Sequence, residues 1–107
     1  MKIDCVDFDS RYSADKGPKL ILDVRELAEV AEGSLKDSLN IPLGELTERG
    51  KELPKDKAIY IYCRSGKRAQ TAYDILTSLG FTKLVCIAKG GFADLKTCSS
   101  FQEGCAQ

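Results

Sequence analysis

Short apolar runs alternate with polar or amphipathic segments along this chain, and turn-forming residues separate them. Such runs are typical of strands that are buried on both faces of a sheet. We predict strands at residues 19–24, 38–41, 58–62 and 84–87, and an edge strand at 1–6. The run at 58–62 is the strongest of these, because it is rich in β-branched and aromatic residues.

A helical pattern is clearest after residue 67, where small and apolar side chains recur at helical spacing until Gly80 ends the pattern. The members of this stripe are Ala69, Ala72, Leu76 and Leu79. Weaker patterns predict a short helix at 25–32, a helix or loop at 43–53 and a short final helix at 92–95. Alternation of strands with helices predicts an α/β fold, with a mostly parallel sheet covered on both faces.

The chain has 107 residues, 43% hydrophobic and 30% charged, which is typical of one globular domain. We expect a single domain over 1–107, in which 97–107 is a polar tail. Sixteen basic residues balance sixteen acidic ones, so no global positive field is expected to bind nucleic acid or an anionic membrane. The first twenty residues carry four aspartates and no long apolar run, which argues against a signal peptide and favours a cytoplasmic location.

The chain has five cysteines, namely Cys5, Cys63, Cys86, Cys98 and Cys105. Because they show no C-x-x-C spacing and the chain has no histidine, we expect no metal site and no cofactor, and free thiols in a reducing compartment. Cys86 lies inside a predicted buried strand and is interpreted as a core residue, and Cys5 lies on or near the edge strand. Cys98 and Cys105 could form a surface disulfide, provide a resolving thiol or have no role.

Cys63 stands where chemistry is expected in this kind of fold. It follows the strongest strand directly, and ligands of open α/β sheets bind beyond the carboxyl ends of the strands, near helix N-termini. Gly66 can adopt a backbone conformation that other residues avoid, so several backbone N–H groups of 63–68 could converge on the sulfur. A buried cysteine that ends a strand can also be a plain core residue.

Three basic residues decide between these readings of Cys63. Arg64, Lys67 and Arg68 follow it within five positions, and no acidic residue lies between Lys57 and Tyr73. A positive local field at a helix N-terminus favours the thiolate form of a cysteine, which is the nucleophile. The same groups would hold a doubly charged oxyanion, although Lys67 alone could be an ordinary solvated charge.

Several segments resemble those of the rhodanese family. Residues 22–26 (LDVRE) resemble its D-V-R-E segment, 40–43 (NIPL) its N-I-P segment, and 63–69 (CRSGKRA) its active-site loop. Residues 90–92, Gly-Gly-Phe, are similar to its closing motif, and the resemblance extends over about 20–96. It implies a rhodanese-like α/β fold, with a central parallel five-stranded sheet and helices on both faces.

The resemblance also implies roles for individual residues. Cys63 would accept the sulfur, and the backbone N–H groups of the loop would cradle the persulfide. The expected substrate-binding residues are Arg64, Ser65, Gly66, Lys67 and Arg68. Asp23 would support the loop and Arg25 would lie in an ion pair, which are structural roles near the site.

Two positions depart from the usual family pattern. Ser34 stands after Gly33, where a histidine is frequent in the family, and Leu95 stands where an aromatic residue often follows the double glycine. Neither position is expected to touch Cys63. The departures therefore bear on substrate preference more than on activity.

The implied activity is that of a thiosulfate sulfurtransferase. The Cys63 thiolate would attack the outer sulfur of thiosulfate, sulfite would leave, and the resulting persulfide would pass its sulfur to cyanide or a thiol, including that of a thioredoxin-like protein. Arg64, Lys67 and Arg68 would steer the anionic donor and stabilise the departing sulfite.

Other functions remain open from the sequence. A cysteine phosphatase of a related fold would use a Cys-x5-Arg loop, but here Ala69 stands six residues after Cys63 and the arginine comes one place earlier, at Arg68. The shorter loop suits one sulfur atom better than a tetrahedral phosphate. Arsenate reduction, which some members of the same fold favour, is another alternative. A persulfide carrier or a regulatory module that serves a protein partner is a further alternative, which the sequence does not separate from a free-standing enzyme.

Overall fold

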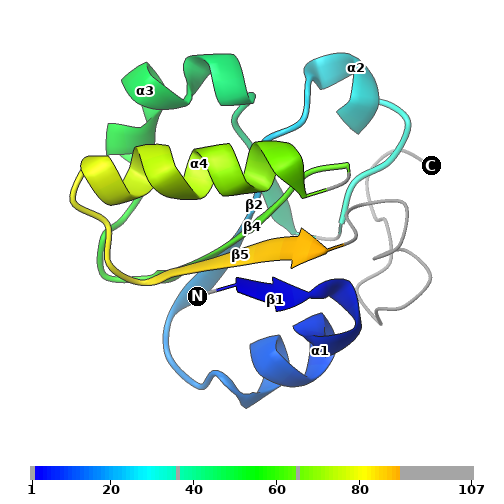
Figure 1. The fold of residues 1–107 in the computed structure, drawn as a ribbon, viewed down its shortest axis with the longest axis vertical. Coiled ribbons are helices and arrows are strands. Elements are labelled where there is room, and N and C mark those ends of the chain that lie inside the picture. Colours follow the sequence, from blue (N-terminus) through cyan, green and yellow to red (C-terminus); the bar gives the residue numbers. More distant parts are fainter. Residues whose placement is uncertain (1, 36, 65, 90–107) are drawn as a thin grey trace.

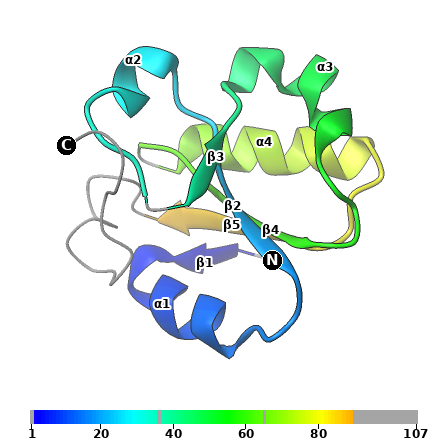
Figure 2. The same cartoon turned by 180° about the vertical axis from the view of Figure 1, so that it is seen from behind.

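The computed structural model of the protein describes residues 2–35, 37–64 and 66–89, and it is built on one parallel β-sheet. Figures 1 and 2 show that α2, α3 and α4 cover one face of this sheet and α1 lies on the other. The strands lie in the order β1-β5-β4-β2-β3, and every neighbouring pair is parallel. The predicted α/β class with a five-stranded parallel sheet is therefore confirmed.

The strands fall close to their predicted positions. Their bounds are Lys2–Asp4 for β1, Lys19–Asp23 for β2, Ser38–Asn40 for β3, Ala58–Tyr62 for β4 and Leu84–Lys89 for β5. β4 has the predicted bounds and the central position in the sheet. Val24 and Ile41 end their predicted strands but lie outside β2 and β3, although both stay buried and donate backbone hydrogen bonds to the neighbouring strand.

The helices differ more from the prediction. α4 spans Lys67–Ser78, as the stripe after residue 67 indicated, and the segment 43–53 forms the short helices η1 (Leu43–Glu45), α3 (Leu46–Arg49) and η2 (Gly50–Glu52). The short helix predicted at 25–32 is only one turn long, α2 (Leu27–Val30), because Arg25 is buried and Glu26 caps the helix. None of the described helices has the length and apolar character needed to cross a membrane.

α1 (Cys5–Ala14) was not predicted, and the edge strand expected at 1–6 ends at Asp4. Its contact with the sheet includes Phe8, which is fully buried and packs on Tyr12 and Tyr60. The short final helix predicted at 92–95 lies outside the described residues.

Strand alternation divides the core into two clusters and decides the side on which Cys63 lies. Ile59, Ile61 and Cys63 share the face that α4 covers, whereas Tyr60 and Tyr62 point to the face of α1. The predicted stripe packs over the first group: Ala69, Ala72 and Leu76 are fully buried, and Leu79 is partly buried. Two of these positions are alanine, so the start of α4 approaches the sheet closely next to Cys63.

We expect Leu76→Ala to lower the free energy of unfolding by about 2–5 kcal/mol, because it leaves a cavity under α4 where the leucine is fully buried. Urea denaturation followed by circular dichroism measures this loss. Leu27→Ala is the matched control, since Leu27 is 70% exposed and its truncation is expected to change stability by less than about 0.5 kcal/mol. Equal losses in the two variants would contradict the packing described for α4.

Candidate active site

Cys63 follows the last residue of the central strand β4 and has no exposed surface. Its Sγ accepts hydrogen bonds from the backbone N–H of Gly66, at 2.9 Å, and of Ala69, at 3.4 Å. Both donors belong to the start of α4, where backbone N–H groups lack partners within the helix. The sulfur thus occupies the place that a capping oxygen takes at many helix starts.

Gly66 makes this arrangement possible. It is the residue that caps α4, and its φ of 101° lies in the left-handed region that residues with a side chain rarely adopt. The chain can therefore turn from the strand into the helix within three residues and direct an N–H back to the sulfur. Ser65, which was also predicted to bind substrate, lies outside the described residues.

The three predicted cations have different environments. Arg64 and Lys67 are exposed and form no ion pair with any described residue. Arg68 instead forms a two-pronged ion pair with Glu29 of α2, with Nη1–Oε1 at 2.6 Å and Nη2–Oε2 at 2.9 Å. Two of the three cations are thus free to meet an anion from solvent, and the third already has a carboxylate partner.

Glu29 is the residue that sequence reasoning missed at this site. The count of acidic residues between Lys57 and Tyr73 took in only neighbours along the chain, whereas Glu29 comes from a helix 39 positions away. The hydrogen bonds from Arg68 are the main reason that the pKa of Glu29 falls to about 2, although partial burial opposes the change. The carboxylate is therefore ionised at neutral pH, and no local sequence signal pointed to it.

Asp23 and Arg25 form a buried ion pair beside the end of β4. The Asp23 carboxylate accepts hydrogen bonds from the backbone N–H, Nε and Nη2 of Arg25, with Nη2–Oδ2 at 2.8 Å. The hydroxyl of Tyr62 donates to the same carboxylate at 2.7 Å and accepts from the N–H of Leu35. Burial, followed by the Asp23 charge, raises the pKa of Tyr62, so its hydroxyl keeps its proton and the donor role.

Arg25 also fixes the segment that carries α2. Its guanidinium donates to the carbonyl oxygen of Gly33 at 2.6 Å and to that of Glu29 at 3.4 Å. From β3, the side-chain amide of Asn40 donates to the carbonyl oxygens of Asp23 and Arg25 at 2.9 and 3.0 Å. The ion pair expected for Arg25 is present, and Asp23 holds Tyr62, the residue that precedes Cys63.

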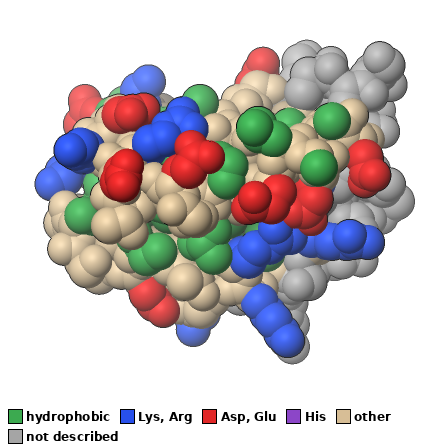
Figure 3. All heavy atoms as spheres, turned by 90° about the horizontal axis from the view of Figure 1, so that it is seen from above, with side chains coloured by type: hydrophobic (Ala, Val, Ile, Leu, Met, Phe, Trp, Pro, Cys, Tyr) green, Lys and Arg blue, Asp and Glu red, His purple; other side chains and the backbone are tan. Residues whose placement is uncertain are grey.

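Charges on the side of the sheet that carries the site are mixed in sign. Figure 3 looks down on the face formed by α2, α3 and α4, where acidic and basic side chains lie interspersed. This face therefore has no broad field of one sign, and attraction for an anion at Cys63 depends on the few groups of the loop.

A match to a protein-family model covers both the sheet and the loop after Cys63. The family model described as Rhodanese-like domain matches residues 8–98, which include the Asp23–Arg25 pair, Cys63 and α4. The chain belongs to this family. As a rhodanese-like domain it is a member of a family of sulfurtransferases.

Named relatives and solved structures agree with this placement. A sulfurtransferase of Allochromatium vinosum is 36% identical over 81 residues, which are 76% of each chain. A candidate sulfur carrier protein of Bacillus subtilis, YrkF, is 39% identical over 70 residues, which are 65% of this chain and only 38% of that protein. The solution structure of the rhodanese-like domain of an Anabaena protein superposes with a TM-score of 0.82 at 26% identity, covering 96% of this chain and 77% of that one.

Of the other cysteines, Cys86 belongs to the same core cluster as Cys63. Cys86 is fully buried in β5, and burial is the main cause that raises its pKa to about 11, so its thiol stays protonated. This agrees with the predicted core role. Cys5 begins α1 directly after the edge strand β1, and Cys98 and Cys105 lie outside the described residues.

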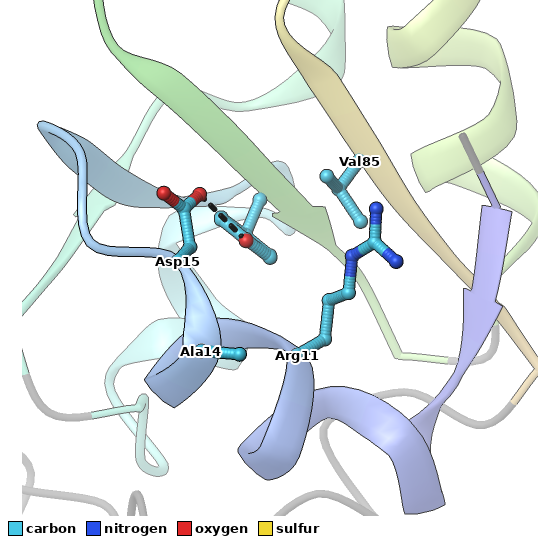
Figure 4. A pocket seen from close by; sticks show the side chains of 5 residues that line it. Arg11, Ala14, Asp15 and Val85 are labelled. Carbon is cyan, nitrogen blue, oxygen red and sulfur yellow. Dashed lines mark hydrogen bonds between the residues drawn. The ribbon is translucent and has the colours of Figure 1, made fainter.

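A hollow of about 310 Å³ lies on the opposite face of the sheet from Cys63. Figure 4 shows Arg11 extending beside Val85, while Asp15 accepts a hydrogen bond of 2.9 Å from the hydroxyl of Tyr60. Since Tyr60 and Val85 point away from the face of Cys63, this hollow is separate from the site. Of the two positions that depart from the family pattern, Ser34 is buried and Leu95 lies outside the described residues.

We expect Arg25→Met to lower the free energy of unfolding by about 3–5 kcal/mol, because it leaves the Asp23 carboxylate buried without its cation. Urea denaturation at neutral pH measures the loss. Arg49→Met is the matched control, since Arg49 pairs with Glu45 on the surface and the same substitution there is expected to change stability far less. Similar losses in both variants would show that the buried pair does not hold the fold.

The carboxyl carbon of Glu29 should titrate by NMR with a midpoint at about pH 2 in the native protein. In Arg68→Gln we expect the midpoint to rise toward the ordinary value of 4.5, because the ion pair is the main cause of the low pKa. A pKa that is lower in the folded than in the unfolded state means that the pair stabilises the protein above about pH 4.5. That stability is lost as the pH falls toward 2, and a native midpoint near 4.5 would contradict the ion pair.

Proposed function

We propose that this rhodanese-like domain transfers a sulfane sulfur from thiosulfate or a similar anionic donor to cyanide or a thiol, through a persulfide on Cys63. The observation that carries the proposal is the position of Sγ, which accepts N–H groups of Gly66 and Ala69 at the start of α4. The thiolate is the form of a cysteine that attacks, and N–H donors directed at Sγ are placed to stabilise charge on the sulfur during the reaction.

In the first half-reaction the Cys63 thiolate attacks the outer sulfur of thiosulfate. A new S–S bond forms at Sγ, the S–S bond of the donor breaks, and its electron pair leaves on sulfite, so no oxidant or proton is consumed. The exposed Arg64 and Lys67 attract the dianionic donor and offset the charge on the departing sulfite. Because Cys63 has no exposed surface, the atoms that cover Sγ must move to admit the donor.

In the second half-reaction an acceptor anion attacks the outer sulfur of the persulfide. The S–S bond breaks, its electrons return to Sγ, and the amides of Gly66 and Ala69 stabilise the regenerated thiolate. Cyanide gives thiocyanate and a thiolate gives a new persulfide. Since the donor's product leaves before the acceptor reacts, ping-pong kinetics are expected.

A persulfide carrier that serves a protein partner is the second candidate. It is supported by the relative YrkF, whose name describes a candidate sulfur carrier. The chemistry at Cys63 would be the same, and only the acceptor would differ, for instance a thioredoxin-like protein thiol. A phosphatase or arsenate reductase has less support, because the loop arginine that would hold the oxyanion, Arg68, is bound to Glu29.

After incubation with thiosulfate, intact-protein mass spectrometry should show the native chain one sulfur heavier, and cyanide should remove that sulfur. Cys63→Ser should gain none, because it lacks the attacking thiolate. Cys86→Ala is the matched control: it removes a buried thiol whose pKa of about 11 keeps it unreactive, and it should gain sulfur like the native chain.

The same preparation separates the two candidates. Transfer to cyanide that is faster than transfer to a reduced thioredoxin would support a free-standing thiosulfate sulfurtransferase, and the reverse order would support a carrier. A native chain that gains no sulfur, or a Cys63→Ser chain that gains as much, would overturn both.

A further inference from the structure

We propose that Glu29 sets the charge that the active-site loop offers to a sulfur donor, because it neutralises Arg68 and leaves Arg64 and Lys67 as the free cations. The inference rests on the proposed function for its reaction, but it concerns which donors the site selects. Glu29 is in this sense a positioning and specificity-determining residue that acts through Arg68.

The contacts of Glu29 hold it in one place. Its two carboxylate oxygens accept hydrogen bonds from Nη1 and Nη2 of Arg68. Oε1 also accepts a hydrogen bond of 3.0 Å from the backbone N–H of Glu26, in the capping box of α2. Its carbonyl oxygen accepts a hydrogen bond from Arg25. α2 buries none of its own residues, so polar contacts rather than packing fix the distance between this helix and α4.

While both Nη atoms of Arg68 bind the Glu29 carboxylate, Arg68 cannot bind a sulfur donor with the same atoms. Its side chain is 31% exposed and that of Glu29 is 21% exposed, so water screens the pair only in part. Arg68 lies next to Ala69, whose N–H reaches the sulfur, so a change of charge at this pair is felt at Cys63. With Glu29 present, the loop offers an arriving anion two uncompensated positive charges rather than three.

If Glu29 has this role, the change in KM on removing its charge should depend on the charge of the sulfur donor. Glu29→Gln keeps the size of the side chain and an oxygen for Arg68 but removes the negative charge. We expect KM to fall by about five- to twentyfold for thiosulfate, a dianion, and by about two- to fourfold for a benzenethiosulfonate, a monoanion. We expect kcat to change by less than about threefold for both donors.

Glu32→Gln is the matched control. Glu32 is an exposed carboxylate three residues further along, with no ion pair to any described residue, so this variant makes the same change in net charge. It should leave both KM values as they are. A fall in KM that is equal for Glu29→Gln and Glu32→Gln would overturn the proposal, since it would reflect only the net charge of the protein.

Arg68→Gln and the double variant decide whether Arg68 itself binds the donor. If Arg68 is neutralised by its ion pair with Glu29, Arg68→Gln leaves the Glu29 carboxylate without a cation near the loop. KM for thiosulfate then rises, because this negative charge repels the donor. Adding Glu29→Gln then recovers part of the lost affinity. If Arg68 is instead the donor's ligand, the double variant stays as poor as Arg68→Gln, and the proposal is wrong.

Sulfate binding provides a readout that needs no turnover. Calorimetry on the full chain should show tighter sulfate binding in Glu29→Gln than in the native protein, and unchanged binding in Glu32→Gln. A protein that takes up no sulfur from thiosulfate would refute the proposed function while this comparison still tests Glu29. Equal sulfate affinity in native and Glu29→Gln protein would refute the role of Glu29 alone. Should Glu29→Gln fail to fold, the sulfate affinity of Arg68→Gln tests the same coupling: the released Glu29 carboxylate should weaken sulfate binding, and an unchanged affinity would refute the proposal.

Discussion

The buried guanidinium of Arg25 is the interaction on which the site depends. A charge that is removed from water is costly unless strong partners replace the water, and Arg25 has the Asp23 carboxylate and two backbone carbonyl oxygens. The same contacts that satisfy the charge join the end of β2 to the segment that carries α2. The position of α2, which has no buried residue of its own, therefore depends on the contacts of this buried cation together with the Arg68–Glu29 pair.

Two chains of contact lead from that ion pair to the sulfur. On one side Asp23 binds the hydroxyl of Tyr62, and the next residue is Cys63. On the other side Arg25 holds the backbone of Glu29, whose side chain holds Arg68 at the start of α4. The cysteine thus lies between two elements that are both tied to the same buried charge, which explains how a short loop can keep two amides directed at one atom.

The sequence predicted the parts of this arrangement that depend on local pattern. The apolar run of β4, the stripe of α4 and the position of Cys63 between them are set by neighbours along the chain, and strand alternation then fixes the face. The same reasoning failed for α1, where Phe8 and Tyr12 lie four positions apart on one helical face that packs on the sheet, a pattern that was not recognised in the sequence. It also missed Glu29, because an ion pair between residues 39 positions apart depends on the packing of α2 over α4.

A site that transfers sulfur from an anionic donor has to bind one anion and release another. Cations that attract thiosulfate also retain sulfite, and binding that is equal for the donor, the transition state and the product does not speed the chemical step. The amides of Gly66 and Ala69 differ from the cations in this respect, because they lie at Sγ itself, where charge is consumed and regenerated. Pairing Arg68 with Glu29 reduces the attraction that is equal for thiosulfate and sulfite. It leaves the N–H groups of Gly66 and Ala69 at Sγ unchanged. Under the proposed function, this arrangement would favour turnover over retention of the product, because the affinity for anions would be set by groups other than those at Sγ.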